Sequence, residues 1–283
     1  MGRALVEDAR VHGISFTGSN EVGAEIARLA AAGLKKVQLE MGGKNPVVVL
    51  EDADLDLAVE GTIQGAFGST GQRCTATSRA IVLDAVHDAF VERLLLRMRD
   101  LRVGDGTDPE VTVGPLVDES QLEKVLEYVE IGTREGAVLR SGGRRLRGGA
   151  LDGGFYMEPT LFTSVTRTMR VAREEIFGPV LCVLRARDLD EALALANDVD
   201  YGLSSSIYSR DVERVFRFVD RIESGITHVN SPTMGGEAQL PFGGVKATGV
   251  GGREMGRTAI EFFTELKTVY VDYTGRKREG HIY

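Results

Sequence analysis

Val37-Gln38-Leu39-Glu40-Met41-Gly42-Gly43-Lys44 is a short apolar run that ends in a carboxylate and continues into two glycines. A second stretch follows it: Phe67-Gly68-Ser69-Thr70-Gly71-Gln72-Arg73-Cys74-Thr75-Ala76-Thr77-Ser78. It places one thiol just past the end of an expected helix. A thiolate can attack a carbonyl carbon, and a carboxylate can later activate a water molecule. Cys74 and Glu40 are therefore the candidate catalytic residues of an enzyme that works through a thioester.

Length and composition exclude several classes of protein. The 283 residues are 42% hydrophobic and 27% charged, which is typical of a globular protein of about two domains. A net charge of −8 with mixed signs disfavours nucleic acid as a partner, and no apolar run is long enough to predict a membrane span. The N-terminus has no signal-peptide core. Two distant cysteines and four scattered histidines indicate a reducing, cytoplasmic setting without a disulfide framework or metal site.

Strands alternate with helices along most of the chain, which predicts a mostly parallel α/β sheet. The expected strands cover 13–17, 36–40, 46–50, 79–83, 180–185, 203–209 and 226–229. The expected helices cover 24–33, 53–67, 85–101, 118–135, 189–197 and 212–222. The Gly-rich, basic stretch 141–149 is interpreted as a solvated turn between short strands.

The turn from Gly18 to Gly23 leads from a strand into an Ala-rich helix, with Ser19 as the N-cap. The N-terminus of such a helix suits a diphosphate, because its first N–H groups are free. Many α/β turns of this form bind nothing, so this stretch alone leaves both interpretations open. Residues 230–246 form either a binding loop or a flexible excursion. Residues 262–273 are expected to form an exposed strand, and a partner subunit would pair with it.

Five separated motifs resemble those of the NAD(P)-dependent aldehyde dehydrogenases, in that family's order. They are the two stretches quoted first, Phe16-Thr17-Gly18-Ser19, Glu174-Glu175-Ile176-Phe177-Gly178-Pro179 and Leu240-Pro241-Phe242-Gly243-Gly244-Val245-Lys246. The resemblance implies an α/β fold with a three-layer parallel sheet. It also implies oxidation of an aldehyde, possibly a semialdehyde, to the carboxylic acid through a thiohemiacetal and a thioester.

The resemblance also assigns roles to residues. Cys74 would be the nucleophile and Glu40 the general base. The residues expected at the NAD or NADP cofactor are Gly18, Ser19, Met41, Gly42, Glu175 and Phe177. The residues expected at the substrate are Phe242, Arg73 and Thr75. No metal is implied, and a homo-oligomer, either a dimer or a tetramer, is expected.

The domain division follows from the same resemblance. Residues 1–42 would be the C-terminal piece of a dinucleotide-binding domain, residues 43–250 the catalytic domain, and residues 251–283 a return segment with an oligomerisation strand. Family members carry an additional N-terminal segment of comparable size. It supplies the adenosine side of the cofactor pocket and an Asn of the oxyanion hole, so the N-terminal half of the cofactor domain is expected to be missing here.

Three alternatives remain open at this point. The chain could be a truncated, inactive remnant that acts only as an oligomer partner. It could retain a cysteine esterase activity from Cys74 and Glu40, since ester hydrolysis needs no hydride acceptor. It could also be a cysteine hydrolase that combines Cys74 with His228 and Asn230. Loss of esterase turnover in Cys74→Ser and its survival in His228→Ala would separate the last two.

Overall fold

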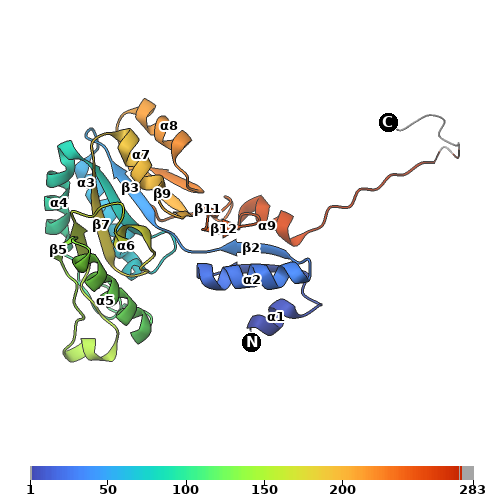
Figure 1. The fold of residues 1–283 in the computed structure, drawn as a ribbon, viewed down its shortest axis with the longest axis horizontal. Helices are drawn as coiled ribbons and strands as arrows, with labels where there is room; N and C mark the ends of the chain where they lie inside the picture. Colours follow the sequence, from blue (N-terminus) through green and yellow to red (C-terminus); the bar gives the residue numbers. More distant parts are fainter. Residues whose placement is uncertain (1, 274, 276–283) are drawn as a thin grey trace.

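The computed structural model describes residues 2–273 and 275, which form two bodies joined by the segment around Gly42 (Figure 1). The larger body surrounds a seven-stranded sheet, and the smaller one surrounds a three-stranded sheet. The chain begins in the smaller body, builds the larger one, and returns to the smaller one near its C-terminal end (Figure 1).

The seven-stranded sheet has the order β10-β9-β3-β4-β7-β6-β5. All its pairings are parallel except that of β5 with β6. Its strands are β3 (Asn45–Val49), β4 (Thr77–Leu83), β5 (Val138–Ser141), β6 (Thr160–Thr163), β7 (Val180–Ala186), β9 (Ser204–Tyr208) and β10 (Ile226–Val229). The parallel sheet expected from the β–α alternation is therefore confirmed.

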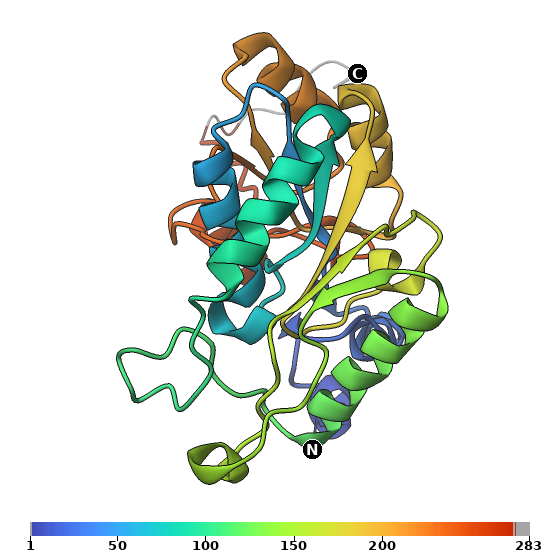
Figure 2. The same ribbon diagram turned by 90° about the vertical axis from the view of Figure 1, so that its left-hand side faces the viewer.

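Both faces of this sheet are covered by helices, which explains why its central strands are apolar at successive positions. In β3, Val47 and Val49 belong to one core cluster, while Val48 and the following Leu50 belong to the other. The first cluster includes side chains of α3 (Leu55–Phe67) and α4 (Asp84–Met98); α4 lies in front of the sheet in Figure 2. The second cluster includes α5 (Glu119–Arg134), α6 (Arg170–Arg173), α7 (Leu189–Asn197) and α8 (Val212–Arg221). The result is the expected three-layer architecture.

The smaller body contains β1 (Gly13–Thr17) parallel to β2 (Lys36–Glu40), with β12 (Gly249–Val250) antiparallel on the other side of β2. Its helices are α1 (Gly2–Glu7), α2 (Asn20–Ala32) and α9 (Gly256–Phe263). A short ribbon of β8 (Tyr201–Gly202) and β11 (Val245–Lys246) joins the two bodies. Because β12 belongs to this sheet, residues 249–250 lie with the piece predicted as 1–42. The rest of the predicted domain division stays a prediction.

The helices begin where the sequence places short polar side chains. Ser19 caps α2 by accepting from the Val22 N–H, and aspartates cap the helices that begin after them. These capping aspartates are Asp54, Asp118, Asp188 and Asp211. Within the part of the chain that the structure describes, no helix has the length and apolar character needed to cross a membrane.

The strand predicted for residues 262–273 is wrong for this chain. Phe262 and Phe263 end helix α9, where their rings pack edge to face. Residues 264–273 belong to no strand among the described residues, and apolar side chains such as Leu266 and Tyr270 are exposed there. An extended segment becomes a strand only where a sheet edge accepts its hydrogen bonds, and no edge formed by the described residues does so. The remaining residues of the predicted C-terminal segment, 274 and 276–283, lie outside the described residues.

Candidate active site

A left-handed turn carries the chain from α3 to the candidate nucleophile. A short 3₁₀ segment, Gly68–Gly71, follows the helix, and Ser69, Thr70 and Gly71 all have positive φ angles of 53°, 59° and 66°. A Cβ on Gly71 would lie 2.2 Å from the backbone oxygen of Gly178. This turn therefore requires a glycine, and it ends the helix so that Cys74 stands at a cavity wall instead of inside a helix.

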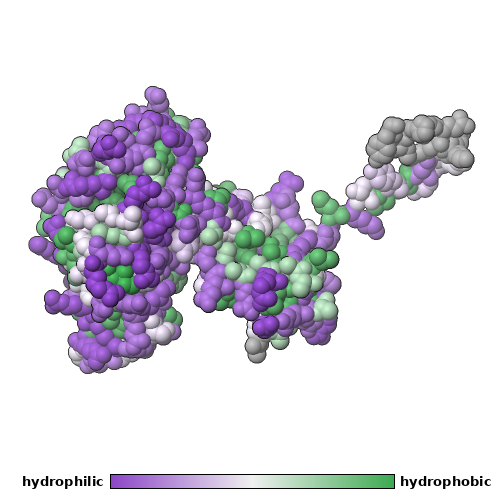
Figure 3. Space-filling view, in the orientation of Figure 1, coloured by the Kyte–Doolittle hydropathy of each residue, from purple (hydrophilic) through white to green (hydrophobic). Residues whose placement is uncertain are grey.

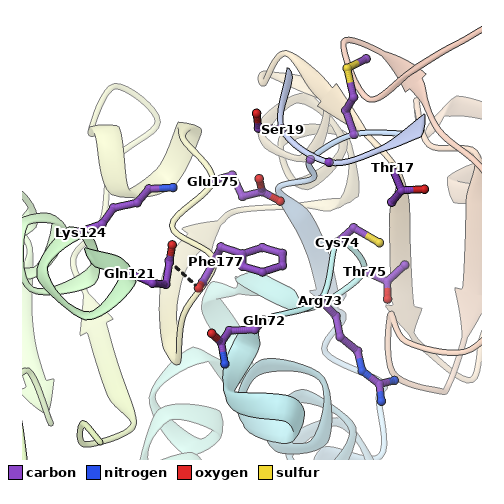
Figure 4. Close-up of a pocket in the computed structure, with 13 residues that line it drawn as sticks. Thr17, Ser19, Gln72, Arg73, Cys74, Thr75, Gln121, Lys124, Glu175 and Phe177 are labelled. Carbon is purple, nitrogen blue, oxygen red and sulfur yellow. Dashed lines mark hydrogen bonds between the residues drawn. The ribbon is translucent and has the colours of Figure 1, made fainter. Parts of the chain in front are cut away.

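The cavity has a volume of about 530 Å³ and is lined by residues of both bodies (Figure 4). Nine of the eleven predicted site residues line it: Gly18, Ser19, Met41, Gly42, Arg73, Cys74, Thr75, Glu175 and Phe177. Four further lining residues are Thr17, Gln72, Gln121 and Lys124. Motifs that are far apart in sequence thus meet around one space, although this placement alone does not establish their roles.

The wall formed by β1 and α2 fits an anionic group of a dinucleotide. The first N–H groups of a 13-residue helix have no partner within the helix, and they carry the positive end of its dipole. Gly18 precedes the cap, and a Cβ there would lie 2.4 Å from the Phe16 ring. Gly18 and Ser19 both line the cavity, so the start of α2 lies where a diphosphate could accept from its free N–H groups.

Glu175 lines the same cavity, and in the view of Figure 4 it lies between the labels of Ser19 and Phe177. Its Oε1 accepts a hydrogen bond from the Gly43 N–H at 2.9 Å. Burial raises the pKa of this carboxyl, while the Gly43 N–H and the charge of Lys124 act in the opposite direction. A carboxylate held in this way can accept hydrogen bonds from the hydroxyl groups of a ribose. The polar and aromatic groups of this wall therefore fit the nicotinamide half of NAD or NADP.

Gln121 and Lys124 are lining residues that the sequence analysis missed. They lie three positions apart on α5, at the edge of the apolar stripe that packs on the sheet. The Gln121 amide donates to the backbone oxygens of Ile176 and Phe177 at 3.0 and 2.8 Å (Figure 4). Phe177 has a φ angle of +59°, so this amide holds a strained backbone in place. In sequence, the pair is indistinguishable from an ordinary solvated helix face.

Cys74 is partly buried, and burial raises the pKa of its thiol, as does the nearby charge of Glu175. The backbone N–H groups of Thr75 and of Cys74 itself act in the opposite direction by stabilising the thiolate. The second cysteine, Cys182, is fully buried in β7 and donates its S–H to the oxygen of Val171, as expected for a core residue.

Glu40 is not among the residues that line the cavity with Cys74. It is 3% exposed at the end of β2, and its carboxylate lies against the Gly243 backbone, where a Cβ would be only 2.1 Å from Oε1. Burial and the neighbouring charge of Glu254 raise the pKa of Glu40 to about 7. Its Oε2 is buried without a hydrogen-bond partner. The raised pKa suits a general base that works near neutral pH.

Phe242 also lies outside the cavity of Cys74. It lines a second space of about 450 Å³, together with His228, Glu237 and Met255. The predicted substrate residue Phe242 is therefore separated from Arg73 and Thr75 in this structure. A glycine-rich loop sequence does not determine which of two adjacent spaces its aromatic residue enters.

The Cys–His–Asn arrangement is not assembled. His228 lines the second space, where burial lowers the pKa of its imidazole. The Asn230 amide is bonded to the backbone of Ser209, accepting from its N–H and donating to its oxygen, both at 3.0 Å. Neither residue is positioned to activate Cys74. Among the described residues, no group of three or more His, Cys, Asp or Glu side chains is placed to hold a metal ion.

Comparison with known proteins identifies relatives along nearly the whole chain. The model of the aldehyde dehydrogenase family matches residues 1–269. An alpha-ketoglutaric semialdehyde dehydrogenase of Bacillus subtilis is 46% identical over 271 residues, which cover 96% of this chain and 56% of that protein. A 2,5-dioxopentanoate dehydrogenase of Saccharolobus solfataricus is 48% identical over 273 residues, covering 95% and 56%. The chain therefore spans about half the length of these relatives.

Solved structures agree with the sequence relatives. An NAD-dependent aldehyde dehydrogenase from Sinorhizobium meliloti has a TM-score of 0.94 at 41% identity, with 98% of this chain and 54% of that chain covered. A betaine aldehyde dehydrogenase from Staphylococcus aureus, solved in complex with NAD⁺, has a TM-score of 0.89 at 35% identity, with 92% and 51% covered. The part of these enzymes that the chain covers, about half of each, therefore has the same fold as this chain.

Proposed function

Because the chain belongs to the aldehyde dehydrogenase family, we propose that it carries the catalytic part of an enzyme that oxidises an aldehyde to its carboxylic acid with NAD or NADP. The observation that carries this proposal is the cavity shared by Cys74, the N-terminus of α2 and Glu175. It combines a nucleophile with an anion-binding backbone and a carboxylate for a ribose. The two free cysteines are consistent with a reducing, cytoplasmic setting.

Cys74 begins the proposed reaction. Its thiolate sulfur forms a bond to the aldehyde carbon, and the carbonyl π electrons move to the oxygen. The Cys74 N–H would stabilise the oxyanion of this thiohemiacetal. A nicotinamide held beside Glu175 and Phe177 would supply the acceptor for the hydride that leaves this carbon as the oxyanion electrons re-form the carbonyl. A thioester on Cys74 remains.

Glu40 completes the proposed reaction. With a pKa of about 7, it can exist as a carboxylate near neutral pH and still hold a proton afterwards. It takes a proton from water, and the hydroxide oxygen bonds to the thioester carbon. The carbon–sulfur bond then breaks, which releases the acid and returns the thiolate. This step requires the Glu40 side chain to turn from the Gly243 backbone toward Cys74.

The proposed substrates are semialdehydes, which carry a carboxylate besides the aldehyde. Arg73 lines the cavity next to Cys74, and its Nε is held by the Ser69 hydroxyl at 2.9 Å. A guanidinium at this place would attract a carboxylate and repel the quaternary ammonium of betaine aldehyde. Arg73→Gln should raise the KM for a semialdehyde and not for a simple alkyl aldehyde. The exposed Arg140→Gln is the matched control.

A homo-oligomer is the proposed assembly. The smaller body shows green, apolar areas on its surface in Figure 3. The exposed apolar side chains of its elements include Val250, Ile260 and Phe263. Residues 264–273 add further exposed apolar side chains without a partner strand among the described residues. Light scattering on the chain and on a variant ending at Phe263 tests this assembly. A dimer or tetramer that becomes monomeric on truncation supports it, and two monomers contradict it.

Formation of reduced nicotinamide tests the activity. The purified chain is mixed with NAD, then NADP, and a panel of aldehydes, and absorbance is followed with Cys74→Ser as the blank. Turnover that disappears in the blank supports the proposal for this chain alone. A silent chain that still hydrolyses a p-nitrophenyl ester through Cys74 indicates a working thiol without hydride transfer. Silence in both assays favours the remnant that acts only in an oligomer.

A further inference from the structure

Three successive carbonyl groups at the nucleophile are held by buried side chains. The Asn45 Nδ2 donates to the oxygens of Cys74 and Ala76 at 2.7 and 2.9 Å. The Thr233 Oγ1 donates to the oxygen between them, that of Thr75, at 2.7 Å. Asn45 is 2% exposed and Thr233 is fully buried. The peptide planes that follow Cys74 are therefore fixed from two sides.

Asn45 and Thr233, the two residues that hold these carbonyl groups, are both hydrogen-bonded to Ser204 of the central sheet. The backbone N–H of Ser204, at the start of β9, donates to the Asn45 Oδ1 at 3.0 Å. The Ser204 hydroxyl donates to the backbone oxygen of Thr233 at 2.7 Å. Asn45 thus uses both donors and its acceptor within a shell that excludes water. Its amide can rotate only by breaking a buried hydrogen bond.

The carbonyl of Cys74 and the N–H of Thr75 belong to one planar peptide group and point in opposite directions. We propose that Asn45 is a positioning residue for the nucleophile: its hydrogen bond to the Cys74 oxygen directs the Thr75 N–H toward the Cys74 sulfur and polarises it. A hydrogen bond at the acceptor end of a peptide strengthens the donor at its other end. The two residues that this geometry serves, Cys74 and Thr75, lie together on the cavity wall (Figure 4).

The effect of the Thr75 N–H on the thiol agrees with this arrangement. Burial and Glu175 raise the pKa of Cys74, and the Thr75 N–H is the largest influence in the opposite direction. A thiol that is desolvated by its cavity needs such a donor if it is to form a thiolate. Asn45 supports that donor without contacting the substrate.

The hydrogen bond from the Thr233 hydroxyl to the Thr75 oxygen provides an internal control. The Thr75 oxygen held by Thr233 shares its peptide with the N–H of Ala76, and that N–H donates to the Arg73 oxygen at 3.0 Å. Removing the hydrogen bond to the Thr75 oxygen therefore disturbs the same turn, but it does not affect an N–H group that faces the Cys74 sulfur. Thr233→Val and Asn45→Ser each remove a buried group that holds a carbonyl of this turn, and they should differ in their effect on the thiol.

Alkylation of Cys74 by iodoacetamide, followed over pH in the full chain, tests the proposal. Cys182 is fully buried, and Cys74→Ser supplies the blank rate. The variants are Asn45→Ser and Thr233→Val. Asn230→Ser serves as the matched remote control, because the Asn230 amide bonds to backbone in the same manner at Ser209.

In Asn45→Ser, the midpoint of the pH–rate profile should rise by about 0.5–1 unit, with a threefold to tenfold slower reaction at pH 7. The profiles of Thr233→Val and Asn230→Ser should match that of the parent. A folded Asn45→Ser protein with the parent's profile overturns the proposal, as does an equal shift in Thr233→Val. If Asn45→Ser does not fold, Asn45→Asp keeps the acceptor for Ser204 and loses both donors. An unmoved profile in that variant overturns the proposal equally.

The proposal rests on the proposed function only in naming Cys74 as the nucleophile. Alkylation requires neither an aldehyde nor a dinucleotide, so its outcome is independent of turnover. A shifted profile in a chain without dehydrogenase activity would keep the role of Asn45 and refute the activity. Dehydrogenase turnover together with an unshifted pH–rate profile would support the activity and refute the role of Asn45.

Discussion

The carboxylate of Glu175 accepts a hydrogen bond from the Gly43 N–H, and the two residues lie 132 positions apart in sequence. A Cβ on the adjacent Gly42 would lie 2.4 Å from the other oxygen of this carboxylate. The two glycines after β2 therefore accommodate the Glu175 side chain. One supplies the donor, and the other leaves the space that the side chain occupies.

Gly42→Ala should displace Glu175 with little loss of stability. The added methyl meets the end of a flexible side chain, so we expect a change in the free energy of unfolding below about 1 kcal/mol. The freed Gly43 amide should exchange its hydrogen faster, as measured by mass spectrometry, and nicotinamide binding should weaken. Gly106→Ala is the control, because a Cβ there meets nothing within 4 Å. An unchanged exchange rate at Gly43 would show that Glu175 keeps its hydrogen bond when residue 42 carries a side chain.

Gln121→Met should loosen the backbone at Phe177. The variant keeps the length of the side chain and removes two hydrogen bonds to the loop before β7. Each is worth about 1 kcal/mol, so amide exchange over residues 174–179 should accelerate by tenfold or more. Glu123→Met, at an exposed position of the same helix, should leave the exchange unchanged. Equal rates in both variants would mean that the strained φ of Phe177 persists without Gln121.

Glu40→Gln should change how stability depends on pH. A carboxyl whose pKa rises from 4.5 to about 7 on folding binds its proton more tightly in the native state. Its stabilising contribution is complete below pH 4.5 and is lost as the pH rises through 7. Between pH 4.5 and pH 7, the free energy of unfolding of the glutamine variant should therefore rise by up to about 3 kcal/mol relative to that of the parent. Urea unfolding from pH 4 to 8 measures the difference, and a constant difference would refute the raised pKa. Glu123→Gln is the exposed control.

Lys44→Met should stabilise the protein at neutral pH. The Lys44 Nζ is buried without a hydrogen-bond partner, and burial lowers the pKa of this amine from 10.5 to about 8. The unfolded chain binds the proton more tightly, so stability is reduced below pH 8 and recovers toward pH 10.5. The methionine variant should be more stable by about 3 kcal/mol at pH 7, with a smaller gain at pH 10. Denaturant titrations at both pH values measure this difference in stability, and the exposed Lys267→Met variant is the control.

The sequence predicted those parts of the fold that local chemistry determines. The start of α2 follows from Ser19, and the position of β3 follows from apolar residues at successive positions that both clusters bury. The C-terminal strand failed because β propensity describes a segment, whereas a strand also needs an edge to pair with. No local signal indicates whether that edge belongs to this chain.

The candidate site shows the same division. Cys74 stands in a Gly-Gln-x-Cys turn that is distinctive by itself, whereas Glu175 and Phe177 were predicted through the resemblance to a family; all three line the cavity. Gln121 and Lys124 were missed because their function depends on which way α5 faces, and only tertiary packing decides that. Glu40 lies at the end of β2, as the sequence predicts, but its carboxylate lies against the Gly243 backbone and outside the main cavity. Phe242 lines the second space instead.

The contact between Thr248 and Gly42 has a consequence for the order of folding. The Thr248 hydroxyl donates to the Gly42 oxygen at 2.8 Å, and the two residues are 206 positions apart. Closing so long a loop of unfolded chain costs several kcal/mol of entropy, so β12 gains little by docking before the sheet between them has formed. Once that sheet exists, the ends of the loop are already close together. The segment that covers Glu40 should therefore fold last and detach first, so that a protease would reach it while the rest of the molecule is still intact.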